Sequence, residues 1–86
     1  MNQMIFIIFT AEGLTQATDD ILHEKAGLWM NPELRAESDL SAFERAGIEI
    51  ETLPHSVDVS NEKAVLAALA HVEALYPKSE ILVEYL

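Results

Sequence analysis

The first hydrophobic segment of the chain is continuous rather than alternating. Residues 4–9, Met-Ile-Phe-Ile-Ile-Phe, place β-branched and aromatic side chains on both faces of an extended segment. A strand that is apolar on both faces is typical of the interior of a parallel sheet. We therefore expect residues 4–9 to form a central strand, with a turn at residues 10–13.

Helical spacing of apolar positions follows in three places. Residues 14–26 predict a first helix, which Gly27 ends as the residue after the C-cap. A second helix is expected from about residue 39 to 46, where Ser41 and Glu44 have capping-box spacing, or from Pro32 with a break. The third is the clearest and extends from its predicted N-cap, Ser60, towards Pro77.

Two further extended segments are predicted. Residues 48–53, Ile-Glu-Ile-Glu-Thr-Leu, alternate between apolar and polar side chains, which indicates a strand with one wet face at the edge of a sheet. Residues 81–86 are mostly apolar and predict a last strand. Residues 28–38 show no clear pattern.

The order of these elements is strand, helix, helix, strand, helix, strand. Strands separated by helices predict an α/β fold with right-handed crossovers. We expect a single domain over residues 1–86, with a small three-stranded, mostly parallel sheet in the order 2-1-3. The first and last helices would then cover opposite faces of this sheet.

Charge narrows the classes of partner. The formal net charge is −10, from fifteen acidic and five basic residues. This excess disfavours nucleic acid and an anionic membrane surface, because both need clustered Lys and Arg. It suits a basic protein partner, although net charge also serves solubility alone. The absence of cysteine and of a basic, apolar leader predicts a cytoplasmic protein. A homodimer is also expected, because so small a domain would bury more apolar surface in a dimer.

A site is expected where the strands end. In the order 2-1-3, the strand order reverses between the first and last strands, and ligands of parallel sheets bind at such points. The polar residues there are ligand-binding candidates: Thr10, Gly13, Thr15 and, from the next strand's exit loop, Ser56. Three residues could converge as acid, base or metal ligands: Glu12, His55 and Asp58. Helix capping and plain solvation compete with this interpretation.

No established cofactor motif supports that site. A strand, a turn with Gly13 and a helix resemble the layout of a phosphate loop. The turn has one glycine and no lysine, however, and Glu12 would repel a phosphate. The histidines lack metal-ligand spacing, so we predict neither a metal nor a cofactor.

Trp29 and Met30 form an apolar pair directly after the first helix. Such residues either complete the core or anchor an interface with a partner or a second copy.

Two functional hypotheses follow. The first is a small acidic, non-catalytic module of the inhibitor, immunity or regulatory type, which binds a basic protein or itself. The alternative is a small enzyme or ligand-binding domain that uses the loops at the carboxyl ends of the strands. The lack of a catalytic motif favours the first.

Overall fold

Four parallel strands form the sheet in the computed structural model, which describes residues 3–84. Their order is β3-β2-β1-β4, and they comprise β1 (Met4–Ile8), β2 (Gly27–Met30), β3 (Ile50–Thr52) and β4 (Glu80–Val83). The α/β class, the central place of β1 and the edge position of β3 are confirmed. The prediction of three strands in the order 2-1-3 is wrong, because an additional strand lies between β1 and β3.

That additional strand is β2, in the segment where the sequence showed no pattern. It is only four residues long and all of its residues are buried, so neither alternation nor length marks it as a strand. Gly27 begins this strand opposite Ile5 of β1. The helix before it ends instead at Lys25, which adopts the left-handed conformation with φ of 52°. Gly27 is therefore not the residue that ends the first helix.

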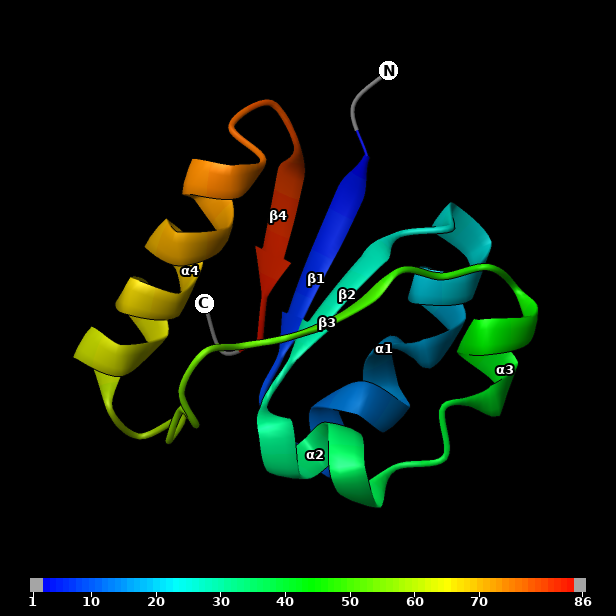
Figure 1. The fold of residues 1–86 in the computed structure, drawn as a ribbon, viewed down its shortest axis with the longest axis horizontal. Helices are drawn as coiled ribbons and strands as arrows, with labels where there is room; N and C mark the ends of the chain where they lie inside the picture. Colours follow the sequence, from blue (N-terminus) through cyan, green and yellow to red (C-terminus); the bar gives the residue numbers. More distant parts are fainter. Residues whose placement is uncertain (1–2, 85–86) are drawn as a thin grey trace.

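Helices cover the two faces of the sheet unequally. One face carries α1 (Ala11–Glu24), α2 (Pro32–Glu37) and α3 (Ser41–Arg45), and the opposite face carries α4 (Glu62–Leu75), as Figure 1 shows. The expected break in the second helical segment thus separates α2 from α3. The expected opposite placement of the first and last helices is confirmed.

Each face of the sheet has its own hydrophobic cluster. Alternate residues of β1 divide between them: Phe6 and Ile8 pack towards α1, whereas Ile5 and Ile7 pack towards α4. This division explains why the N-terminal segment is apolar at every position. The free energy that holds the layers together comes chiefly from this burial on both sides of one strand.

Two further helix ends predicted from capping residues differ in the structure. Asn61, not Ser60, caps α4, because its side chain accepts a hydrogen bond from the Ala64 amide at 3.2 Å. Ser41 lies inside α3 and donates its hydroxyl to Asp39 instead of capping the helix. Gly47 ends the α3 segment with φ of 78°, as predicted.

The last strand is shorter than predicted. It comprises Glu80–Val83 and runs parallel to β1, with Ile81 opposite Ile5. Residues 85–86 of the predicted strand lie outside the described part of the chain.

Candidate functional site

The carboxyl ends of β1 and β4 mark the point where the strand order reverses. The chain leaves β1 through α1 towards β2 and β3, and then returns through α4 to β4 on the other side of β1. This is the place in a parallel sheet where loops separate and ligands bind. The predicted location of the site between the N-terminal and last strands therefore corresponds to a real feature of the fold.

A side chain of the protein itself occupies this point. Glu84 follows β4, and its Oε1 accepts hydrogen bonds from the amides of Phe9 at 2.7 Å and Thr10 at 3.0 Å. Its Oε2 accepts the Thr10 hydroxyl at 2.5 Å. The carboxylate thus meets three donors between β1 and the start of α1, where the helix dipole also favours negative charge.

Gly13 makes room for this carboxylate. A Cβ atom added at Gly13 would collide with the carboxyl group of Glu84. The Gly13 amide itself donates to the Thr10 hydroxyl oxygen at 3.0 Å, which caps α1. Thr10, predicted to bind a ligand, therefore binds Glu84 and caps α1, whereas Gly13, predicted likewise, leaves space for that carboxylate.

This arrangement bears directly on the resemblance to a phosphate loop. Two main-chain amides directly before α1 already donate to Glu84, whose negative charge lies near the start of the helix, where a phosphate would bind. Sequence reasoning did not find Glu84, because it lies 74 residues from Thr10 in the chain. Only the parallel pairing of β4 with β1 brings the two together.

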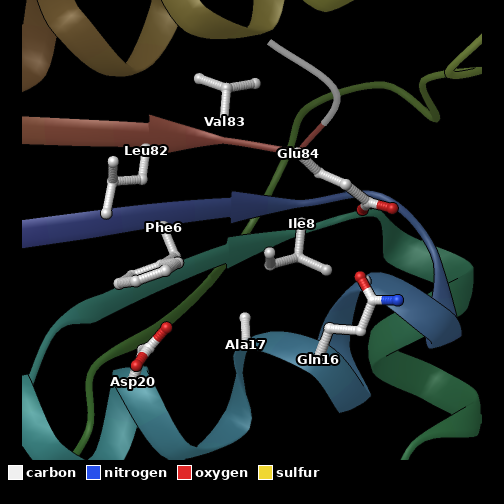
Figure 2. Close-up of a pocket in the computed structure, with 9 residues that line it drawn as sticks. Phe6, Ile8, Gln16, Ala17, Asp20, Leu82, Val83 and Glu84 are labelled. Carbon is white, nitrogen blue, oxygen red and sulfur yellow. The ribbon is translucent and has the colours of Figure 1, made fainter.

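A groove opens beside Glu84 on the α1 side of the sheet. Figure 2 shows Phe6, Ile8 and Leu82 on its strand side, with α1 opposite them, and it has a volume of about 320 Å³. Leu82 is 39% exposed there. The groove exists because α1 packs over β1 and β2, while no helix among residues 3–84 covers this side of β4.

The three residues proposed as acid, base or metal ligand have separate surroundings. The Glu12 carboxylate accepts a 3.4 Å hydrogen bond from Gln16, and His55 is exposed in the loop after β3. Asp58 accepts the amide and hydroxyl of Ser60 at 2.9 and 2.8 Å, and these bonds lower the pKa of Asp58. In the described range 3–84, no three His, Asp or Glu side chains form a group that could hold a metal ion.

The two remaining polar candidates have local partners. The Thr15 hydroxyl donates to the Ala11 carbonyl oxygen at 3.1 Å, one turn earlier in α1. The Ser56 hydroxyl donates to Glu33 at 2.5 Å and thereby ties the loop after β3 to α2. Mainly because of this hydrogen bond, the pKa of Glu33 is lowered.

Ser56 and His55 also line a second groove. It lies between the loop after β3 and α4, has a volume of about 480 Å³ and is mostly apolar. His71 of α4 lies on its wall and makes an edge-to-face contact with Trp29, with ring centroids 5.6 Å apart. Its other lining residues are Leu53, Pro54, Val57, Ala64, Ala67 and Ala68.

Asn31, the residue that follows β2 and precedes α2, is the polar centre of the carboxyl-terminal edge of the sheet. Its side chain makes no cap hydrogen bond and is 2% exposed. Its Nδ2 donates to the carbonyl oxygens of Phe9 at 3.1 Å and Val57 at 2.9 Å, and its Oδ1 accepts the Val57 amide at 2.8 Å. Asn31 therefore joins the ends of β1 and β2 to the loop that leads into α4.

Trp29 and Met30 are not part of a surface. They lie in β2 and are 7% and 0% exposed, so they belong to the core and offer no interface anchor. Their side chains point to opposite faces, Trp29 towards α4 and Met30 towards α1.

Comparison with known proteins adds no family to this description. The chain matches no family model, no curated protein and no solved structure. No helix in the described part of the chain is long and apolar enough to span a membrane.

Proposed function

We propose that this chain is a non-catalytic protein-binding module that binds a basic protein partner through its α1–α3 side. The observation that carries this proposal is the unequal distribution of charge between the two helical layers. The helices α1, α2 and α3 and the segments that join them, other than the uncharged strand β2, lie within residues 11–46 and contain eight acidic and three basic residues. The helix α4 on the other face has two acidic residues and one basic residue.

All eight carboxylates of this layer are exposed to solvent. They are Glu12, Asp19, Asp20, Glu24, Glu33, Glu37, Asp39 and Glu44. Such a surface attracts a basic partner over several ångströms and accelerates its association. The same field repels nucleic acid and acidic proteins, which gives the surface selectivity.

Two of these carboxylates are held in the ionised form by local hydrogen bonds. The Ser56 hydroxyl lowers the pKa of Glu33, and the hydroxyl and amide of Ser41 lower the pKa of Asp39. Both groups therefore lose their charge at a lower pH than they would without these hydrogen bonds. The occupied point at Glu84 supports a non-catalytic role, because the donors that would stabilise a reacting anion are already used.

The experiment compares two pairs of charge-neutralising substitutions. The full chain is tagged and used at low salt to recover a partner from its host, and the purified partner is titrated against variants by calorimetry. The variant D19N/D20N removes two charges from α1, whereas the control E62Q/E80Q removes two exposed charges outside the α1–α3 layer. We expect a loss of affinity of at least about fivefold for the first pair and little change for the control.

Binding should also weaken steeply as salt is added, since exposed charges are screened beyond about 10 Å at 0.1 M salt. Equal effects of the two pairs would mean that net charge alone matters. A partner that is retained at high salt, or one that is itself acidic, would contradict the proposal.

A second candidate is a small-ligand function of the groove between the loop after β3 and α4. Its volume of about 480 Å³ lies within the usual range of ligand pockets, and two imidazoles and a hydroxyl border its apolar wall. Amide NMR shifts during titration with neutral aromatic fragments test this candidate. The variant A67L should block the shifts at His71 by filling the groove, and an unchanged titration would contradict the candidate.

A further inference from the structure

The solvent-facing side of α4 is more apolar than a surface helix requires. On this side Leu66 is 46% exposed and Ala70 is also exposed, whereas Leu75, which is 55% exposed, lies on another side of the helix. The buried side already contains the residues that pack on the sheet, Val65, Ala68 and Val72. A helix that is apolar on both sides is typically covered on both sides.

Four of the exposed residues on the outer side of α4 have the spacing of a helix–helix seam. They are Lys63, Leu66, Ala70 and Glu73, separated by three, four and three residues. This alternation of three and four is the spacing of the positions that face a partner helix in a coiled coil. We call these four residues the α4 seam.

The α4 seam is complementary to itself when two copies pack antiparallel. Lys63 and Glu73 are equidistant from position 68, and so are Leu66 and Ala70. A two-fold axis at that level places Lys63 of each copy opposite Glu73 of the other, and Leu66 opposite Ala70. The small side chain of Ala70 leaves space for the leucine and allows the helices to approach closely.

Within one chain, Lys63 cannot pair with Glu73. Ten residues of helix separate them by about 15 Å along the axis. The pairing that the α4 seam offers is therefore available only between copies.

The charge of the rest of the molecule favours this face as the place of contact. Two copies that each have a net charge of −10 repel one another over most of their surface. Over Glu62–Leu75, however, the acidic excess is only one residue, compared with five in the α1–α3 layer. Contact through α4 brings the acidic layers of the two copies to opposite ends of the assembly.

From these observations we infer that the chain forms a symmetric dimer, in which the α4 seam of one copy packs antiparallel against that of a second copy. A single pair of helices buries less area than the roughly 1,200–2,000 Å² of stable interfaces, so the association is weak and depends on concentration. This dimer leaves the α1–α3 layer free and does not depend on the basic partner proposed above.

Sedimentation velocity of the full chain over a range of concentrations tests the inference with a charge exchange. Alone, K63E sets carboxylate against carboxylate at both ends of the α4 seam, and E73K sets ammonium against ammonium. Each variant should therefore dimerise about tenfold more weakly than wild type. Mixed, the two variants restore both opposite-charge pairs, so a heterodimer of wild-type affinity is expected. Circular dichroism of each variant verifies that it is folded.

A matched pair of leucine substitutions locates the contact on the helix. L66D should give a monomer, whereas L75D should leave the dimer intact, because Leu75 is exposed on a different side of α4. A wild-type monomer at all concentrations would overturn the inference. So would a dimer that survives L66D, or a mixture of K63E and E73K that associates no better than its components.

Discussion

Replacing Asn31 should destabilise the protein more than any substitution that removes a single hydrogen bond at the protein surface. The side chain of Asn31 makes three hydrogen bonds with main-chain groups of Phe9 and Val57, at 2.8–3.1 Å. In N31A, two carbonyl oxygens and one amide lose their partner in a region where the side chain was 2% exposed. The cost of these unpaired groups dominates the effect, and the small cavity that the alanine leaves adds to it.

The size of the effect can be worked from these contacts. A buried polar group left without a partner costs about 1–3 kcal/mol, and partial entry of water at the rim lowers that cost. We therefore expect N31A to reduce the free energy of unfolding by about 3–5 kcal/mol in total. A domain of this size has a total stability of about 5–10 kcal/mol and loses about 4–8 °C of Tm per kcal/mol. The Tm should accordingly fall by about 12–40 °C.

Urea unfolding monitored by Trp29 fluorescence measures this loss. Trp29 is the single tryptophan of the chain and is 7% exposed, so its emission changes when the core opens. The matched control is N61A, which removes one exposed cap hydrogen bond and should cost about 1 kcal/mol. The nearly isosteric N31D keeps the acceptor but sets a carboxylate against two carbonyl oxygens, and it should be at least as destabilising as N31A.

Similar losses of stability in N31A and N61A would contradict this prediction. That result would mean that the main-chain groups around Asn31 find other partners at little cost. A stable N31D would do so as well, because it would show that the two donated hydrogen bonds are dispensable.

Three further predictions concern single positions. In urea unfolding, G47A should lower the free energy of unfolding by about 1 kcal/mol, because φ is 78° at Gly47. G27A should be nearly neutral, because its new Cβ would lie 3.5 Å from its nearest neighbours. Equal costs for the two substitutions would contradict this prediction. E84A should lose about 1–2 kcal/mol because three donors at the start of α1 lose a charged acceptor, and an unchanged midpoint would show that water replaces it fully. The pKa of Asp58 is lowered first by the amide and second by the hydroxyl of Ser60, so S60A should raise it in a carboxyl NMR titration. The lowered pKa of Asp58 stabilises the fold at pH values above its unfolded-state pKa. This stabilisation is lost as the pH falls through the folded-state pKa. The destabilisation caused by S60A should therefore disappear over the same pH range.

The pattern of apolar and polar residues predicted the central place of β1 and the edge position of β3, because it depends on which faces of each strand are buried. Residues 4–9 are apolar at every position because both faces of β1 are buried, and this property is visible without any tertiary information. The alternation in residues 48–53 likewise indicated the edge position of β3. By contrast, β2 was missed because four buried residues after a helix have too short a pattern to distinguish a strand from a core loop.

The point where the strand order reverses was predicted correctly, but the residues that meet there were not. The point where the strand order reverses depends only on which strands flank β1, so its location followed from the predicted topology. The roles of Glu84, which occupies this point, and of Asn31, which joins the strand ends, did not follow from the predicted topology. An isolated glutamate or asparagine carries no signal of a partner that lies far away in the chain.

Residues close together in the chain were therefore enough to establish the α/β class, the burial of β1 on both sides, the helical faces and the excess of negative charge. The tertiary structure alone decided which polar groups meet. Glu84 reaches the amides of Phe9 and Thr10 only because β4 pairs with β1, and Asn31 reaches Val57 only because β2 lies between β1 and β3. Hydrogen bonds act over about 3 Å, so contacts across 22–75 residues exist only once the sheet has formed.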